Sequence, residues 1–254
     1  IMKKIAVLLI FALTLVSCMP DDTQNTPGDG TTSVLTLKFT HNWEGVELSP
    51  ANFGSLEYTN ENGDLMSITK LKYLVSNIRF HVVGGGTVVA PGYLLIDAQD
   101  PTSTIITNTV VIPNGVYQKL TFTFGFNQDD NAENYPDLNS ANWNWPEELG
   151  GGYHFMQLEG QYNTNEGPAP YALHYGTARV SEGVFEVNHF NAEIDENVTI
   201  GPATTIEIAM DVSEWFKDPN TWDLNEFNVD LMGNYEAQKM IQENGYSVFD
   251  FGGL

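Results

Sequence analysis

The sequence is poor in cysteine and in basic residues. Its 254 residues include one cysteine and 10 lysines and arginines, against 33 aspartates and glutamates, for a formal net charge of −23. A single cysteine excludes a disulfide within the chain, so a folded domain must depend on its hydrophobic core. The negative charge repels phosphate groups, and nucleic acid is therefore not expected as a partner.

Sequence signatures of catalysis are also missing. The chain has no Gly-x-Ser-x-Gly motif, no phosphate-binding glycine loop and no His-Glu-x-x-His motif. Paired carboxylates are too abundant to single out a glycosidase pair. We therefore expect a protein that is not an enzyme, and its histidines and aromatic residues become the candidates for function.

The apolar residues near the N-terminus are too few for a membrane-spanning helix. Lys3 and Lys4 precede an apolar run over residues 5–16, which is followed by Ser17 and Cys18. Leu-Val-Ser-Cys resembles the lipobox of bacterial lipoproteins, in which the cysteine is acylated. Residues 1–17 are thus predicted to be a lipoprotein signal peptide. Cys18 is the predicted lipidation site and the link to the membrane.

The residues after Cys18 predict a location and a linker. Residues 18–33 have no apolar period and are predicted to form a flexible tether. Asp21 and Asp22 resemble the acidic signals that direct some lipoproteins to the outer cell surface. We expect an outer-membrane lipoprotein of the cell envelope that faces the periplasm or the cell surface.

From residue 34 onward, apolar side chains recur at every second position. Leu35, Leu37 and Phe39 share one face of the first such segment. About ten short segments of this kind, with helices only near the end, predict one domain over residues 34–254, an all-β antiparallel sandwich of Greek-key type with short C-terminal helices. The expected strands are 34–41, 55–59, 66–69, 71–83, 93–97, 105–112, 118–126, 153–162, 170–179, 184–190 and 204–212. Asn234 is expected to cap a helix that runs through Asn244, with Gly245 as its C-cap.

Three histidines are predicted to face inward by their phase on the expected strands. His41 ends the first apolar stripe, His154 shares a face with Met156, and His174 lies among small residues. Imidazoles brought together from distant strands are a common way to build a copper or zinc site. The alternative is that these histidines only form hydrogen bonds within the core.

Two other features suggest different ligands. Residues 127–150 form a long polar loop, and its acidic positions 129–137 supply oxygen donors suited to calcium, although without the spacing of an EF-hand. Several aromatic residues could instead form a stacking platform for sugars, or simply cap the core. The platform residues are Trp43, Trp143, Trp145, Tyr153 and Tyr162.

Several motifs, in a consistent order over residues 34–250, resemble those of the MbnP-like family. They are Leu-Lys-Phe-Thr-His-Asn-Trp (37–43), Leu-Lys-Tyr-Leu-Val-Ser-Asn-Ile (71–78), Trp-Asn-Trp-Pro with Gly-Gly-Tyr-His-Phe-Met-Gln-Leu-Glu-Gly (143–160), Leu-His-Tyr-Gly (173–176) and Glu-Trp-Phe-Lys-Asp-Pro (214–219). The resemblance implies a periplasmic copper-binding protein in which histidines and a tryptophan oxidised to kynurenine hold the metal. It also implies a di-haem partner enzyme that performs this oxidation.

Transferred to this sequence, the resemblance implies that His174 is a copper ligand and that Trp143 or Trp145 is the modified residue. His154 or His41 would supply the second imidazole. The resulting hypothesis is a lipid-anchored protein that captures or delivers copper at the cell envelope without turnover. The alternative is a surface lipoprotein that binds glycans or protein partners, with structural histidines.

Overall fold

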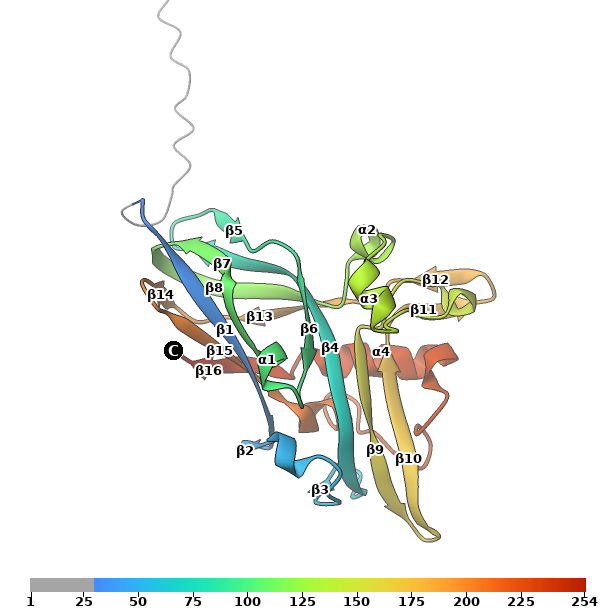
Figure 1. The fold of residues 1–254 in the computed structure, drawn as a ribbon. Helices are drawn as coiled ribbons and strands as arrows, with labels where there is room; N and C mark the ends of the chain where they lie inside the picture. Colours follow the sequence, from blue (N-terminus) through green and yellow to red (C-terminus); the bar gives the residue numbers. More distant parts are fainter. Residues whose placement is uncertain (1–29) are drawn as a thin grey trace, which may run out of the picture.

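The computed structural model describes residues 30–254, except for the side chains of residues 108 and 109. The predicted signal peptide, Cys18 and most of the predicted tether lie outside the described residues. The described chain is a sandwich of two main β-sheets (Figure 1), which confirms the predicted all-β fold. No helix within residues 30–254 is long and apolar enough to span a membrane.

The first sheet is built around β1 (Thr32–Trp43), which begins two residues before the predicted start of the domain. Its order is β16-β15-β1-β2, and β7 pairs with β1 as well. The flanking strands are β2 (Val46–Glu47), β7 (Ile105–Pro113), β15 (Thr205–Asp211) and β16 (Phe249–Gly253). β1 and β15 pair in parallel, so the sheet is not antiparallel throughout as predicted.

The second sheet is built around β4 (Leu65–Val82), an 18-residue strand that merges two predicted strands. Its order is β10-β9-β4-β8-β13, with further strands paired to β4 and β8. The other strands are β3 (Tyr58–Thr59), β5 (Thr87–Val89), β6 (Tyr93–Asp97), β8 (Gly115–Phe124), β9 (Met156–Thr164), β10 (Gly167–Tyr175), β13 (Phe190–Ile194) and β14 (Val198–Ile200). β10 is an edge strand, and Pro168 and Pro170 limit further pairing there.

The core lies between the two sheets, where alternate residues of facing strands interdigitate. Tyr73 of β4 stacks on Phe124 of β8 with ring centroids 5.6 Å apart, and it contacts Phe39 of β1 edge to face at 6.3 Å. Phe249 of β16 packs on Phe122 at 4.9 Å. This aromatic layer supplies the apolar burial that a domain without disulfides needs.

The long loop between β8 and β9 is folded into short helices. These are α2 (Gln128–Asn131), α3 (Pro136–Ser140) and η2 (Glu147–Leu149). The Asn127 side chain caps α2 by accepting from the N–H groups of Asp129 and Asp130. In Figure 1 the loop lies beside a small hairpin of β11 (Ala178–Ser181) and β12 (Val184–Glu186). The loop is therefore fixed over one end of β9 and β10.

The helices α1 (Pro101–Thr104), η1 (Pro50–Asn52), η3 (Val212–Phe216), η4 (Leu231–Gly233) and α4 (Tyr235–Gly245) complete the fold. The Asn234 side chain accepts from the N–H of Ala237, which confirms the predicted cap of α4. The predicted C-cap is wrong by one residue, because Gly245 is the last residue of the helix and Tyr246 is the C-cap. A Cβ at Gly245 would collide with the Phe190 ring, so the glycine is needed for close packing.

Candidate metal site

The candidate site lies on the outer face of β9 and β10. His174 of β10 pairs with Gln157 of β9, while the adjacent pair of Leu173 and Leu158 is fully buried in the core. Because successive side chains of a strand point to opposite faces, His174 and Gln157 project away from the core. The site is therefore outside the sandwich and depends on other elements to cover it.

His154 reaches the same face from the segment before β9. Its ring centroid lies 5.2 Å from that of His174, and the two rings are nearly perpendicular, at 88°. The predicted phase of His154 with Met156 is wrong, because regular pairing begins only at Met156 and the chain bends just before it. The predicted burial is right, since His154 is only 6% exposed.

Both candidate tryptophans pack against His154. The ring centroids of Trp145 and Trp143 lie 5.0 and 5.5 Å from that of His154. Gly176 makes room for Trp145, because a Cβ at this position would lie 2.7 Å from the indole. The small residues around His174 therefore do leave space, and an indole fills it.

The glycines of the predicted hinge fold the loop back onto the site. Gly150, Gly151 and Gly152 all have positive φ, a conformation that glycine adopts without strain. The turn lets the backbone N–H of Trp145 donate to the Gly152 carbonyl, and the backbone N–H of His154 donate to the Trp143 carbonyl. These two bonds fix both tryptophans over His154.

The two tryptophans differ in their hydrogen bonding. The indole Nε1 of Trp145 donates to the Leu149 carbonyl at 3.2 Å. The Nε1 of Trp143 is shielded from solvent and has no partner within the described residues. A buried N–H without an acceptor lowers the stability of the fold by about 1–3 kcal/mol. Of the two tryptophans, Trp143 is therefore the one whose indole N–H can still form a hydrogen bond.

Burial keeps the His154 imidazole neutral. Desolvation is the main cause that lowers its pKa to about 3; the neighbouring His174 and Lys70 act in the same direction, and the Glu159 carboxylate opposes them. Its Nδ1 is shielded from solvent and has no hydrogen-bond partner within residues 30–254. A neutral imidazole with an unpartnered nitrogen is the form that binds a metal ion.

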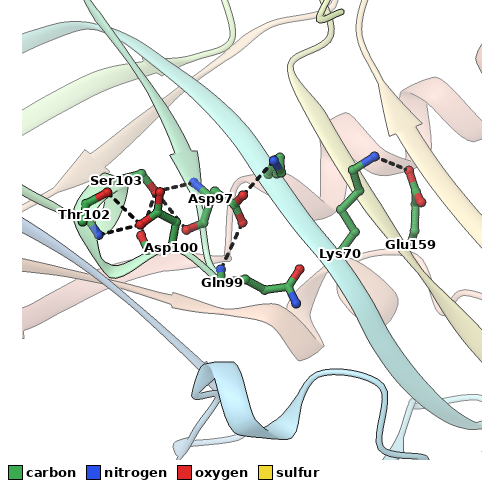
Figure 2. Close-up of polar contacts among 8 residues, drawn as sticks. Lys70, Asp97, Gln99, Asp100, Thr102, Ser103 and Glu159 are labelled. Atoms are coloured by element: carbon green, nitrogen blue, oxygen red, sulfur yellow. Dashed lines mark hydrogen bonds and ion pairs between the residues drawn. The ribbon is translucent and has the colours of Figure 1, made fainter. Parts of the chain in front are cut away.

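His174 is oriented by a carboxylate that was not among the predicted site residues. Its Nε2 lies 2.9 Å from Oε1 of Glu159, which also accepts from Lys70 at 2.9 Å. Figure 2 shows Lys70 reaching from β4 toward Glu159 on β9. The hydrogen bond from His174 and the ammonium of Lys70 lower the pKa of Glu159 to about 2. This arrangement leaves Nδ1 of His174 for another ligand.

Gln238 of α4 holds the backbone on either side of His174. Its Nε2 donates to the His174 carbonyl at 2.7 Å, and its Oε1 accepts from the Gly176 N–H at 3.2 Å. Gln238 is fully buried. No sequence signal identifies it, because it lies more than sixty residues from the strand that it supports.

His41 is not brought to this pair. Its Nε2 lies 3.0 Å from the hydroxyl oxygen of Tyr73, a residue of β4 that pairs with Met156 on the core face of the second sheet. His154 and His174 contact each other on the other face of that sheet. Burial lowers the pKa of His41 to about 4, opposed by the charge of Asp97. The prediction that His41 could share their site is not supported, because the sheet separates them.

The donor set of the pair fits a metal ion through two imidazoles. A metal–nitrogen bond of about 2 Å places two imidazole centroids on one ion roughly 4–6 Å apart, a range that includes the separation of His154 and His174. Within the part of the chain that the structure describes, no three His, Cys, Asp or Glu side chains converge on a common metal position. Within residues 30–254, a third protein donor would therefore be of another residue type.

The other two predicted sites look different in the structure. In the 129–137 loop, Asp130 accepts from the Asn127 amide and Asp137 accepts from the Tyr93 hydroxyl, so these oxygens bind protein donors rather than converge on a calcium position. The prediction of an aromatic stacking platform is wrong, because the residues assigned to it are buried in the interior. Trp43, Trp143, Trp145, Tyr153 and Tyr162 are all at most 6% exposed.

Comparisons with known proteins agree with this fold. A family model described as MbnP matches residues 32–233. Among solved structures, MbnP from Methylosinus trichosporium superposes with a TM-score of 0.50 at 12% sequence identity, covering 75% of this chain and 80% of that chain. At this identity the structural likeness concerns the fold alone. No curated protein matches the chain significantly.

Proposed function

The chain belongs to the MbnP family, and on this basis we propose that it is a copper-binding protein that captures or delivers copper at the cell envelope without turnover. The observation that carries the proposal is the His154–His174 pair. One imidazole is buried, neutral and unpartnered at Nδ1, and the other is oriented by a carboxylate at Nε2. Both features are typical of histidines that serve as metal ligands.

His154 and His174 would hold the ion. Imidazole suits copper, zinc and nickel, and the family membership favours copper among them. Bound copper would add a redox-active centre to the site, and the surrounding indoles would restrict the access of water to it. Glu159 acts through His174, because its hydrogen bond at Nε2 leaves Nδ1 for the ion.

Trp143 is the better candidate for oxidation to kynurenine. Its Nε1 has no acceptor within the described residues, whereas that of Trp145 is bonded to the Leu149 carbonyl. Oxidation at Trp143 would therefore not break a hydrogen bond that supports the loop. A di-haem partner enzyme would carry out the oxidation, and the lipid on Cys18 would keep the protein at the membrane. Mass spectrometry of the peptide that contains residues 143–162 should find that Trp143 has gained one oxygen and lost one carbon, the change expected for kynurenine.

Metal analysis of the full chain, exported to the periplasm of a copper-supplemented host, tests the proposal. We expect about one copper per chain in the wild type and less than a tenth of that in His154→Ala and His174→Ala, because one imidazole cannot hold the ion alone. His81→Ala is the matched control, since His81 binds only Thr121 and Thr87 on the outer face of the second sheet. Equal copper in His174→Ala and wild type would refute the assignment.

A further inference from the structure

A buried amide lies beside the histidine pair without a hydrogen-bond partner. Gln157 of β9 is only 7% exposed, and its side chain forms no hydrogen bond with another residue in the part of the chain that the structure describes. Buried polar side chains in folded proteins nearly always have such a partner. An unpartnered amide lowers the stability of the fold, so its presence at this position calls for a role.

Strand pairing places Gln157 directly beside His174. The two residues are register partners across β9 and β10, and they share the outer face of the sheet. Opposite side chains on one face of an antiparallel pair have Cβ atoms about 4.5–5.5 Å apart, a distance that a glutamine side chain can span. The ring centroid of His154 lies 5.2 Å from that of His174. The Gln157 amide is therefore within reach of the space between the two imidazoles.

The neighbours of Gln157 on this face are bonded elsewhere. On the side away from His174, its register partner is Lys72 of β4, whose ammonium group forms an ion pair with a carboxylate of β6 at 2.7 Å. Glu159 is the next outer-face residue of β9. It accepts from His174 and, as Figure 2 shows, from Lys70. Neither neighbour therefore uses the Gln157 amide.

The amide oxygen of Gln157 is the kind of donor that the pair lacks. Within residues 30–254, no third histidine, cysteine or carboxylate side chain joins the two imidazoles around a common position. The indole N–H groups of Trp143 and Trp145 are hydrogen-bond donors only, so they offer no lone pair to a metal ion. A glutamine oxygen has two lone pairs, and glutamine serves as a weak axial ligand beside imidazoles in some copper sites.

We propose that the amide oxygen of Gln157 is the third protein ligand of the copper ion and that it favours the Cu(II) state. This inference rests on the proposed function, because it needs the ion that His154 and His174 would hold. Nitrogen and oxygen donors suit Cu(II), whereas soft sulfur donors select Cu(I). An oxygen ligand therefore lowers the reduction potential of the bound ion.

Separate measurement of the Cu(II) and Cu(I) affinities of the full chain, by competition with a chelator for each oxidation state, tests the proposal. Gln157→Leu nearly keeps the size of the side chain and removes its oxygen. This variant should bind Cu(II) about tenfold more weakly and Cu(I) within about twofold of the wild type, because both imidazoles remain. A tenfold loss for Cu(II) alone raises the reduction potential by about 59 mV, which voltammetry measures independently.

Two further variants separate a ligand from a structural residue. Gln157→Glu keeps an oxygen donor and adds a negative charge, so it should bind Cu(II) at least as tightly as the wild type and lower the reduction potential. Gln161→Leu makes the same replacement at an exposed position on the same face of β9, two outer-face positions further along. It should leave both affinities unchanged. Circular dichroism checks that each variant is folded.

The outcomes distinguish this inference from the proposed function. If the wild type binds copper and Gln157→Leu keeps its full Cu(II) affinity, the inference is overturned and the function stands. Equal weakening of Cu(II) and Cu(I) in Gln157→Leu would also overturn the inference, because it would indicate a structural role. A wild type that binds neither Cu(II) nor Cu(I) would overturn both.

Discussion

His41 and His154 are both buried and both neutral, yet they lie on opposite faces of one sheet and have different partners. His41 lies in the sandwich core, where its Nε2 and the Tyr73 hydroxyl satisfy each other. His154 lies under the loop on the outer face, and its Nδ1 has no partner within the described residues. A buried polar group normally has a hydrogen bond, so an exception calls for an explanation. The comparison teaches that the missing partner, and not burial, distinguishes a candidate ligand from a structural histidine.

Replacement of each histidine by leucine should show the largest difference between the two faces. In metal-free protein, His41→Leu leaves the buried Tyr73 hydroxyl unpaired and should lower the free energy of unfolding by about 1–3 kcal/mol. His154→Leu removes a group that already lacks a partner, and it should change the free energy of unfolding by less than about 1 kcal/mol. Urea unfolding measures both values.

For the same two variants, the copper content should show the opposite order to the stability. His154→Leu should lose copper, and His41→Leu should keep the wild-type amount per folded chain. If His154→Leu were the less stable of the two in metal-free protein, the His154 imidazole would have an important structural role, and the distinction drawn between the two faces would fail.

The architecture was largely predictable from the sequence, because alternating apolar residues report strands directly. The stripe of Leu35, Leu37 and Phe39 is buried as predicted, and the Asn234 cap is in place. The parallel pairing of β1 with β15 was not predictable, since alternating apolar residues identify the two faces of a strand but not the strands that pair with it.

The site was predictable only in part. Phase was misleading for His154 because the chain bends just before β9, and a bend shifts every preceding side chain relative to the strand. Gly176 gave a usable signal of space beside His174. Glu159 gave a weak one as a charged residue in a strand, and Gln238 gave none, because its contact spans the distance between β10 and α4.

The pH dependence of stability should be the next largest effect. Unfolded histidine takes up a proton as the pH falls below 6.5, whereas folded His41 and His154 stay neutral down to pKa values of about 4 and about 3. Between these values the unfolded chain binds more protons, so a fall in pH favours unfolding. Each histidine should lower the free energy of unfolding by about 2 kcal/mol when the pH falls from 7 to 5.

Urea unfolding at pH 7 and at pH 5 measures this effect. It is carried out on three metal-free proteins: the wild type, His41→Leu and His154→Leu. Each variant should lose about 2 kcal/mol of the wild-type pH dependence, since one of the two groups is gone. Glu159 does not contribute in this range, because its stabilising effect is lost only below its ordinary pKa of 4.5. An unchanged pH dependence in His154→Leu would mean that this imidazole is solvated in the folded protein.

The smallest effect should come from Glu159, which touches the candidate site only through His174. Glu159→Ala removes the acceptor that orients the imidazole and should weaken copper binding about tenfold, the lower end of what such supporting residues contribute. Glu159→Gln keeps an acceptor oxygen and should recover part of that loss. Because Glu159 is about one-third exposed, we expect its ion pair with Lys70 to add less than about 1 kcal/mol to stability.

Glu207 on the first sheet is the matched control for Glu159. It likewise pairs with a lysine, Lys38, and accepts from a second side chain, that of Thr40, but it contacts no histidine. Competition with a copper chelator should therefore give wild-type affinity for Glu207→Ala and reduced affinity for Glu159→Ala, while urea unfolding gives both variants similar stability. Equal copper affinity in the two variants would show that the carboxylate does not orient His174. The outer-face pair would then bind copper without support from Glu159, and its nearly perpendicular rings would be held by the tryptophan loop and by the hydrogen bonds of Gln238 to the backbone around His174.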